Sequence, residues 1–332
     1  MFKGKSVLIT GGTGSFGQEF VRRSLERCSP KKLIVYSRDE MKQWDMAAKF
    51  SDHQNLRFFI GDIKDKERLL RALSGVDIVI HAAATKIVPI AEYNPFECVK
   101  TNVIGAMNVI DACIDKGVSQ VVALSTDKAS SPINLYGATK LTSDKLFVAG
   151  NSYSGEHGTR FSVVRYGNVM GSRGSVIPFF KGIIDSGGKT LPVTNPSMTR
   201  FMITLEQGVE LVWLALEDMK GGEIYVKKIP SMNIMDIADS VSATAEKKIV
   251  GLRPGEKVHE QMIGIEDAPF TFEYDSFYKI LPAIHDWYKT KSRIKNGQLV
   301  NLDFSYKSDT NSHWMEKNTL KEWIRRNLEV GK

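Results

Sequence analysis

The sequence predicts a doubly wound α/β fold around a mostly parallel sheet. Short apolar runs alternate with helical patterns from Lys5 to about Val164, which is the order of strands and crossover helices in such folds. These runs are apolar throughout, as in strands that are buried on both faces of a parallel sheet. The first run leads directly into a glycine-rich turn and then into a helical pattern.

Each expected strand is short and rich in Val, Ile, Leu or Phe. The expected strands are Val7 to Thr10, Leu33 to Tyr36, Phe58 to Ile60, Ile78 to Ala82, Val121 to Ser125 and Phe161 to Arg165. A helical pattern from Leu141 to Ala149 follows the fifth strand. The polar residues between that strand and that helix therefore lie at a strand-to-helix junction, where doubly wound folds place their sites.

The pattern changes past Gly167 to shorter elements that contain many aromatic residues and prolines. We expect a smaller, interlocked substrate-binding lobe there, folded over the carboxyl edge of the sheet. Helical periodicity from Met202 to Asp218 suggests a return to the first domain. The predicted division is a dinucleotide-binding domain over 1–168 with 200–228, and a lobe over 169–199 and 229–332. Thr319 and Glu322 suggest a capping box that opens a final helix.

Composition is that of an ordinary globular protein, with 42% hydrophobic and 25% charged residues among 332. No apolar run approaches the ~20 residues of a membrane span, and no signal segment precedes the first strand, so we expect a cytoplasmic protein without a membrane partner. The three cysteines have no C-x-x-C spacing and the six histidines form no ligand cluster, so no metal is expected.

The net charge of +7 is compatible with nucleic acid or with small phosphorylated ligands. Basic residues are spread along the chain rather than massed beside aromatic ones. A pyrophosphate ligand therefore explains the charge with fewer assumptions, and we expect no nucleic-acid partner.

The glycine-rich turn has the pattern of a Rossmann-type phosphate-binding loop. Gly11, Gly14 and Gly17 permit a tight turn, close approach of backbone amides to a pyrophosphate, and helix-to-strand packing. The positive end of the following helix favours the negative charge. The cofactor residues expected in this turn are Gly11, Thr13, Gly14, Ser15, Phe16 and Gly17.

The ends of the next three strands suggest which dinucleotide is bound. Arg38 and Lys42 follow the second strand, where an arginine accommodates the 2′-phosphate of NADP; Asp39 beside them keeps NAD as an alternative. Asp62 and Ile63 end the third strand, where a carboxylate accepts from the adenine amino group or caps the following turn. Small side chains that let a cofactor approach the backbone end the fourth, namely Ala82, Ala83 and Ala84.

Tyr136 and Lys140 are four residues apart and therefore share one helical face. An ammonium near a phenol lowers its pKa from the ordinary value of about 10 toward neutrality, so Tyr136 is a candidate base for an alcohol proton. Taken alone, such a pair is also common on protein surfaces. Its position after a glycine turn, an alanine run and Thr126 favours the catalytic interpretation.

In that order, these motifs resemble the extended short-chain dehydrogenase/reductases that act on nucleotide sugars. The resemblance covers essentially the whole chain. It implies that Thr126 and Tyr136 bind the sugar hydroxyl being oxidised, that Tyr136 takes its proton, and that Lys140 holds the nicotinamide ribose.

Longer motifs narrow the resemblance to the inverting UDP-N-acetylglucosamine 4,6-dehydratases of pseudaminic acid biosynthesis. These motifs are Ser125-Thr126-Asp127-Lys128-Ala129, Asn134 to Lys140, Arg165 to Val169, Gly171 to Val176 and Arg253-Pro254-Gly255-Glu256-Lys257. Retaining sugar dehydratases carry Asp-Glu after the threonine, whereas this chain has Asp127-Lys128.

The implied reaction explains why an acid and a base are needed. Oxidation at C4 by NADP⁺ acidifies the C5 proton, which a base removes while an acid protonates the departing C6 hydroxyl, and the hydride returns to C6. We expect Lys128, kept neutral by desolvation or nearby positive charge, to be the base and Asp127 to be the acid.

Residues for the sugar-nucleotide end are inferred mainly from the resemblance, which implies a UDP-N-acetylglucosamine substrate. Arg200 and Arg253 offer bidentate donors for phosphate oxygens. For each cation the alternative is a solvated charge or a structural ion pair. The expected substrate contacts are Lys86, Asn168, Arg173, Val176, Arg200 and Arg253.

Two other functions fit parts of the sequence. A nucleotide-sugar epimerase of the same fold needs no acid/base pair such as Asp127-Lys128, and a silent NADP-binding regulator needs neither Tyr136 nor Lys140. We also expect a homo-oligomer, because relatives assemble through surface helices and Ala106 to Ala112 could belong to one.

Overall fold

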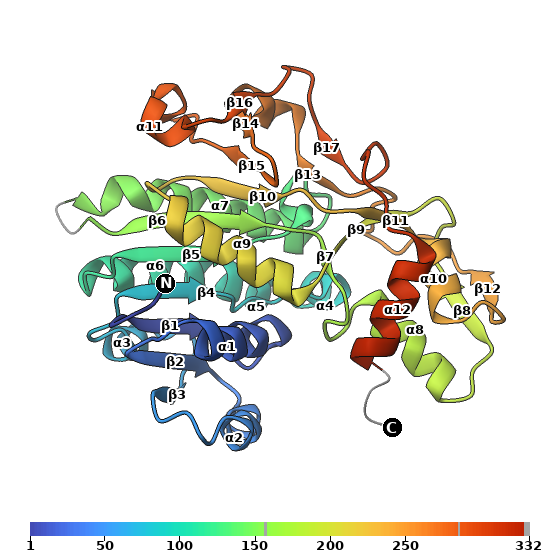
Figure 1. Cartoon of the computed structure of the whole chain (residues 1–332), viewed down its shortest axis with the longest axis horizontal. Coiled ribbons are helices and arrows are strands. Elements are labelled where there is room, and N and C mark those ends of the chain that lie inside the picture. Colours follow the sequence, from blue (N-terminus) through green and yellow to red (C-terminus); the bar gives the residue numbers. More distant parts are fainter. Residues whose placement is uncertain (156–157, 285, 329–332) are drawn as a thin grey trace.

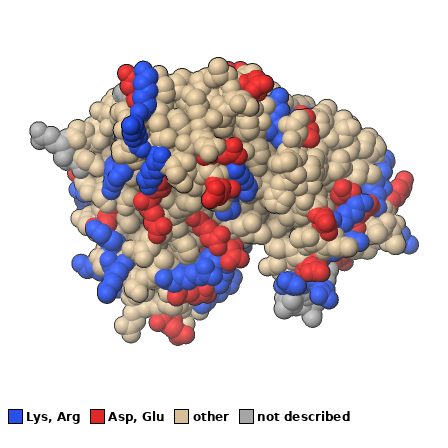
Figure 2. All heavy atoms as spheres, turned by 45° about the horizontal axis from the view of Figure 1, so that its top comes forward, with Lys and Arg blue, Asp and Glu red and all other residues tan. Residues whose placement is uncertain are grey.

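The computed structural model describes residues 1–155, 158–284 and 286–328. It has a large domain built on one central sheet and a smaller lobe at one end of that sheet (Figure 1). The outline is hollowed between these two parts, and on the face drawn in Figure 2 Lys and Arg side chains are interspersed with Asp and Glu. Within these three ranges, no helix is long and apolar enough to cross a membrane.

The central sheet has ten strands in the order β16-β14-β15-β10-β6-β5-β4-β1-β2-β3. Seven of these strands, from β10 to β3, are parallel to one another, and β15, β14 and β16 add an antiparallel edge. The bounds are β1 Ser6–Thr10, β2 Lys32–Ser37, β3 Leu56–Ile60, β4 Ile78–His81, β5 Gln120–Leu124, β6 Arg160–Arg165, β10 Ile224–Lys227, β14 Thr271–Glu273, β15 Phe277–Ile280 and β16 Gln298–Leu299.

Helices cover both faces of this sheet. The α-helices are α1 Ser15–Arg27, α2 Glu40–Lys49, α3 Lys66–Ala72, α4 Val88–Tyr93, α5 Pro95–Val99, α6 Gly105–Asp115, α7 Leu135–Tyr153, α8 Val176–Asp185, α9 Leu205–Asp218, α10 Ile234–Val241, α11 Lys291–Ile294 and α12 Lys317–Leu328. A π-helix, η1 Lys100–Ile104, joins α5 to α6, and the short 3₁₀ helices are η2 Asp127–Ala129, η4 Ile265–Phe270 and η5 Asp286–Lys289.

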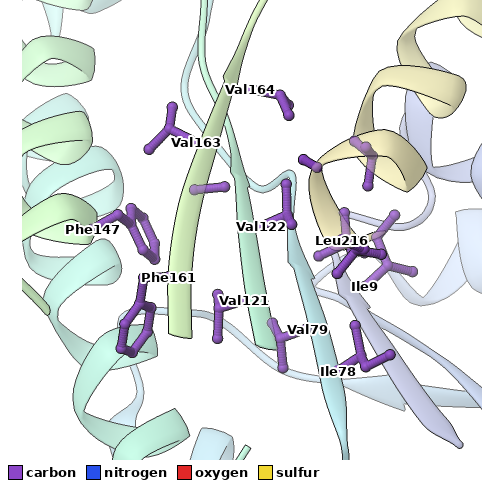
Figure 3. Packing of buried hydrophobic residues seen from close by; sticks show 14 of the residues in the cluster. Ile9, Ile78, Val79, Val121, Val122, Phe147, Phe161, Val163, Val164 and Leu216 are labelled. Atoms are coloured by element: carbon purple, nitrogen blue, oxygen red, sulfur yellow. The ribbon is translucent and has the colours of Figure 1, made fainter. Parts of the chain in front are cut away.

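The main core lies between the sheet and these helices (Figure 3). On one side Phe147 of α7 packs against Phe161 of β6, with ring centroids 6.2 Å apart. On the other side Leu216 of α9 lies near Ile9 of β1. Because both faces are buried, the strands need no polar alternation, which explains their uninterrupted apolar runs.

A second core holds the smaller lobe together. It gathers Ile177 and Phe180 of α8, Ile237 of α10, and Leu320 and Ile324 of α12. Short strands complete this lobe and link it to the large domain: β7 Asn168–Val169, β8 Thr190–Val193, β9 Thr199–Ile203, β11 Ser231–Asn233, β12 Glu246–Ile249, β13 Gln261–Ile263 and β17 Tyr306–Lys307.

The doubly wound fold predicted from the sequence is confirmed, and all six expected strands are present within one or two residues. Three boundaries differ. Helix α7 begins at Leu135 rather than Leu141, because the Asn134 side chain caps it by accepting a hydrogen bond from the Gly137 amide at 2.7 Å. Residues Met202 and Ile203 belong to β9, and a capping box of Thr204 and Gln207 opens α9.

At the C-terminus, α12 begins at Lys317, so Thr319 lies inside the helix and not at its cap. Strands β14, β15 and β16, which the predicted division assigns to the smaller lobe, extend the central sheet instead. They do so because β15 pairs antiparallel with β10 through Ile224 and Ile280, which continues the row of backbone hydrogen bonds.

Candidate active site

The carboxyl ends of the parallel strands meet at one edge of the sheet. Gly11 follows β1, Arg38 follows β2, Ala82 follows β4 and Thr126 follows β5. Since this edge is where open α/β sheets bind ligands, residues far apart in the sequence come together there.

The glycine turn is packed too tightly for any larger residue. Gly11 has a φ of +67°, and a Cβ on it would lie 2.8 Å from the Ala83 amide nitrogen. A Cβ on Gly17 would lie 2.4 Å from the backbone of Gly12. The turn therefore rests directly against the alanine run after β4, and α1 rests directly against the turn.

This turn fits a pyrophosphate. Gly14 is the N-cap of α1 and, within the described part of the chain, no side chain caps the helix, so the first-turn amides at Ser15 and Phe16 can donate to an anion. The first turn also contains no acidic residue. Phe16 itself stacks on Phe20 and Tyr166, which makes its side chain part of the core rather than a ligand contact.

The alanine run is held by Thr10. Its hydroxyl oxygen accepts hydrogen bonds from the amides of Ala82 and Ala83, each at 3.2 Å. Ala84 is exposed. The backbone here is therefore rigid and bordered by small side chains, as an extended cofactor requires.

Charged residues after β2 and β3 form ion pairs among themselves. The Arg38 guanidinium lies 3.6 Å from the Asp62 carboxylate, and the Lys42 ammonium lies 2.6 Å from Asp39. Asp62 also accepts from the Lys64 amide at 3.0 Å, which is the turn-capping role foreseen as its alternative. Ile63 is buried against Gly105, so its side chain serves packing.

A polar cluster follows β5 in helix η2. The Thr126 hydroxyl donates to Asp127 Oδ1 at 2.9 Å, and Lys128 Nζ donates to the same oxygen at 3.1 Å. Lys128 Nζ also lies 2.9 Å from Glu260 Oε1. The carboxylates of Asp127 and Glu260 are buried, so the Lys128 ammonium lies between two buried carboxylates.

The neutral Lys128 expected from the sequence is wrong for this cluster. Burial lowers the pKa of Lys128, but the attraction of Asp127 and Glu260 outweighs burial and raises that pKa above its ordinary value. Burial together with the Glu260 charge raises the pKa of Asp127, although Lys128 opposes this. Asp127 is therefore favoured in the protonated form that an acid needs, and Lys128 in the charged form.

Glu260 behaves differently from Asp127. Burial raises its pKa, but Lys128 and Arg200 outweigh burial, so the Glu260 pKa is lowered and its carboxylate is ionised while Lys128 is charged. The two carboxylates and Lys128 thus titrate as one coupled set.

The expected lowering of the Tyr136 pKa is also wrong. Burial raises the pKa of Tyr136 to about 12, and Lys128 rather than Lys140 is the cation that opposes this rise. Lys140 points elsewhere, since its Nζ donates to the Leu124 carbonyl at 2.8 Å, and burial lowers its own pKa. Both side chains are nevertheless buried on α7, next to the η2 cluster.

Two contacts join the glycine turn to the rest of the site. Tyr166 stacks on Phe16, and its carbonyl accepts from the Asp127 amide at 3.2 Å. The Arg173 amide donates to Ser15 Oγ at 3.3 Å, and the Arg173 carbonyl accepts from Lys86 Nζ at 3.0 Å. Lys86 and Arg173 therefore lie beside the turn, where burial lowers the pKa of Lys86.

The other expected substrate residues are more dispersed. Arg200 is buried and its guanidinium donates to the carbonyls of Thr199, Val258 and Lys257, so its donors are engaged and the expected bidentate grip on phosphate is not available. Arg253 is exposed and pairs with Glu256 at 2.7 Å, the structural alternative. Asn168 lies in β7, and Val176 begins α8 against the second core.

Sequence reasoning missed Glu260 and the buried pair of Asp144 with Arg165. Asp144 accepts from Ser125 Oγ at 2.8 Å and from Arg165 at 3.1 Å, which anchors the residue just before Thr126. Glu260 follows the Arg253 to Lys257 motif by three residues, but its contact with Lys128 joins residues 132 positions apart and leaves no local signal.

Known proteins resemble the chain over almost its full length. Residues 7–282 match the family of polysaccharide biosynthesis proteins. The UDP-N-acetylglucosamine 4,6-dehydratase (inverting) of Campylobacter jejuni strain 81-176 is 53% identical, with 98% of each chain covered. A UDP-glucose 4-epimerase of Rickettsia typhi is 40% identical over 97% of this chain and 95% of that one.

Solved structures agree with this placement. Pen from Bacillus thuringiensis superposes with a TM-score of 0.90 at 37% identity and covers 98% of both chains. DesIV of Streptomyces venezuelae, a dTDP-glucose 4,6-dehydratase solved with NAD, has a TM-score of 0.68 at 26% identity over 76% of this chain and 86% of that one. The chain therefore belongs to the polysaccharide biosynthesis protein family, within the extended short-chain dehydrogenase/reductases that include the inverting UDP-N-acetylglucosamine 4,6-dehydratases.

Proposed function

We propose that this protein is a C5-inverting UDP-N-acetylglucosamine 4,6-dehydratase. The observation that carries the proposal is the Asp127-Lys128 pair, in which Asp127 is buried and Lys128 is partly buried. The pair lies beside Thr126 and Tyr136 and places a candidate acid and a candidate base together. The 53% identity to an enzyme of that name supports the same substrate and reaction. The net reaction is a hydro-lyase reaction that gives a UDP-2-acetamido-2,6-dideoxy-4-keto-hexose.

Each residue has a separate task in this proposal. The glycine turn would hold a nicotinamide dinucleotide, which would supply the hydride transfer between C4 and C6. Thr126 and Tyr136 hold the O4 hydroxyl, and Tyr136 takes its proton when the phenol is in its ionised form. Lys128 removes the C5 proton once C4 is a ketone, and Asp127 protonates the departing C6 hydroxyl, which leaves as water. Return of a proton to the opposite face of C5 gives inversion.

The proposed cofactor is NADP. Arg38 is 65% exposed and lies at the end of β2, where its guanidinium can exchange Asp62 for a 2′-phosphate. DesIV, by contrast, was solved with NAD. An Arg38→Ala variant should lose affinity for NADP⁺ about tenfold or more and keep its affinity for NAD⁺, as measured by isothermal titration calorimetry. Equal losses for both dinucleotides would exclude this role of Arg38.

The smaller lobe is proposed to bind the sugar nucleotide. Arg173 contacts Ser15 of the glycine turn and Lys86 contacts Arg173, so these two residues are the candidates for the phosphates of the sugar nucleotide. A role in pseudaminic acid biosynthesis and a homo-oligomeric state complete the proposal and rest on the family resemblance. The proposed cytoplasmic location rests on the hydropathy pattern of the sequence.

An epimerase is the second candidate, because a relative with 40% identity carries that name. Mass spectrometry separates the two activities. Incubation with UDP-N-acetylglucosamine and no added reductant should give a product lighter by one water, and Tyr136→Phe, which removes the phenolic oxygen, should not form it. A product of unchanged mass would favour the epimerase.

A further inference from the structure

The charged state of Lys128 poses a problem for the proposed reaction. Lys128 must be neutral to remove the C5 proton, yet it lies between two carboxylates that stabilise its positive charge. Its third proton must therefore move before or during the reaction. A buried acceptor within hydrogen-bonding distance would let this happen without bulk water.

Among the residues that the structure describes, two carboxylates lie within hydrogen-bonding distance of Lys128 Nζ. Asp127 lies 3.1 Å away, but its own proton is needed for the departing hydroxyl, so it cannot also take one. Glu260 lies 2.9 Å away and is ionised, with 2% of its side chain exposed. Lys128 Nζ contacts Glu260 Oε1, which is the oxygen that can take the proton, whereas Oε2 is buried and has no hydrogen-bond partner among the described residues.

Glu260 is held firmly in this position. Its amide donates to Ser308 Oγ at 2.9 Å, and its carbonyl accepts from the Ser308 amide at 2.8 Å. The carboxylate is thus placed by the backbone of a segment far from η2 in the sequence. These hydrogen bonds fix the backbone of Glu260, from which its carboxylate reaches Lys128.

We propose that Glu260 is a positioning residue that holds Lys128 and accepts its proton, so that Lys128 can act as the base. This inference rests on the proposed dehydratase function. One N–H bond of Lys128 breaks and an O–H bond forms on Glu260; the freed lone pair of Lys128 takes the C5 proton. Asp127 gives its proton to the C6 hydroxyl, and water leaves. Asp127, Lys128 and Glu260 together then hold as many protons as before, because one proton has come from C5 and one has left in the water molecule.

The other titratable or charged groups near Glu260 do not exchange a proton with Lys128. Arg200 Nε lies 3.7 Å from Glu260 Oε1 but does not exchange a proton with it, because a guanidinium stays protonated in proteins. Lys257 stabilises the ionised form of Glu260 but donates to the Ser130 carbonyl at 2.7 Å. His259 is turned to Thr199 Oγ1 at 2.8 Å.

The test compares Glu260→Gln with wild type across pH. Glutamine keeps the shape and an acceptor oxygen for Lys128 but cannot store the proton. The active form of wild type holds two titrating protons on Asp127, Lys128 and Glu260. The active form of the variant holds one titrating proton on Asp127 and Lys128. We expect kcat at pH 7 to fall about 100-fold or more, KM to stay within about twofold, and the pH optimum to move to higher pH by at least about one unit.

Three controls make this test decisive. Glu266→Gln removes the same charge at an exposed position and should behave as wild type. In Glu260→Gln, oxidation at C4 persists, so addition of substrate should build up the absorbance of the reduced nicotinamide while water loss is slow. Glu260→Asp retains a carboxylate and should recover part of kcat; it also replaces Glu260→Gln if the latter does not fold.

The outcomes separate the two proposals. If wild type releases no water from UDP-N-acetylglucosamine, the dehydratase function fails. If wild type is active and Glu260→Gln matches it, or loses kcat with an unmoved pH optimum and no build-up of reduced nicotinamide, the role of Glu260 is overturned while the dehydratase function stands.

Discussion

The close packing of Gly17 against Gly12 lets us predict how much a methyl group at Gly17 lowers the melting temperature. In Gly17→Ala the new methyl group would lie 2.4 Å from the Gly12 backbone, so the turn or helix α1 must shift. Gly182→Ala adds the same group to α8 at a position with no heavy atom of the described residues within 4 Å. Both changes gain the same helix propensity, so their difference isolates the contact at the turn.

The expected difference follows from overpacking. Forcing an extra methyl group into a packed site costs about 1–3 kcal/mol. Unfolding entropy of about 2.1 cal/mol/K per residue gives about 0.7 kcal/mol/K for 332 residues, so Gly17→Ala should melt about 1.5–4 °C below Gly182→Ala. NADP⁺ at 100 times its Kd adds about 2.7 kcal/mol to wild type, or about 4 °C, and Gly17→Ala should lose most of this gain.

Differential scanning fluorimetry with and without NADP⁺ measures both effects. Equal melting temperatures of the two variants, together with an NADP⁺ response of Gly17→Ala equal to that of wild type, would refute the reasoning. If Gly182→Ala also loses the rise in melting temperature that NADP⁺ causes, and to the same extent, this loss does not come from the glycine turn.

Three further predictions concern stability and substrate binding. Asp144→Ala leaves the buried Arg165 with the more distant Asp267 carboxylate, 3.8 Å away, and should lower the free energy of unfolding by about 2–4 kcal/mol in urea titrations. Asp303→Ala, at an exposed site, should change it by less than about 0.5 kcal/mol, and similar values for both variants would contradict this. Burial lowers the pKa of His81 to about 3, below the unfolded value of about 6.5. Between pH 6.5 and 3 the unfolded chain therefore binds more protons than the folded one, so the free energy of unfolding should fall as the pH falls. In His81→Gln the slope of this free energy against pH should be shallower by up to about 1.4 kcal/mol per pH unit, and equal slopes in wild type and variant would exclude His81 as the cause. Arg253→Ala should raise KM for the sugar nucleotide about tenfold with kcat and melting temperature unchanged, because its exposed guanidinium can leave Glu256 for phosphate; an unchanged KM would leave Arg253 as a surface ion pair.

Sequence patterns were sufficient for six of the parallel strands of the sheet and for the glycine turn after the first of them. Six buried strands and a glycine turn are local signals, since apolar runs and glycine spacing do not depend on distant residues. The start of α7 was missed because Tyr136 and Lys140 interrupt the apolar pattern, although Asn134 offers a capping signal. Strands β14 to β16 were assigned to the wrong part because pairing with β10 is a long-range contact.

Protonation states could not be predicted in the same way. The sequence places Lys128 next to Asp127, but the second carboxylate, Glu260, comes from a segment 132 residues away and reverses the expected charge of the lysine. The cation near Tyr136 is likewise Lys128 and not Lys140, because Lys140 donates to the Leu124 carbonyl. Arg200 was expected to bind phosphate because a guanidinium offers bidentate donors. The expectation failed because three backbone carbonyls already accept from it, and the sequence does not reveal these contacts.

Proton NMR of the product formed from UDP-N-acetylglucosamine in D₂O tests the central claim most directly. It reports the loss of water, the configuration at C5 and the origin of the C5 hydrogen in one spectrum. The dehydratase account predicts a C6 methyl group, a 4-keto sugar and an inverted C5 that carries deuterium. A C4 epimer that keeps its C6 hydroxyl and its C5 proton would contradict it.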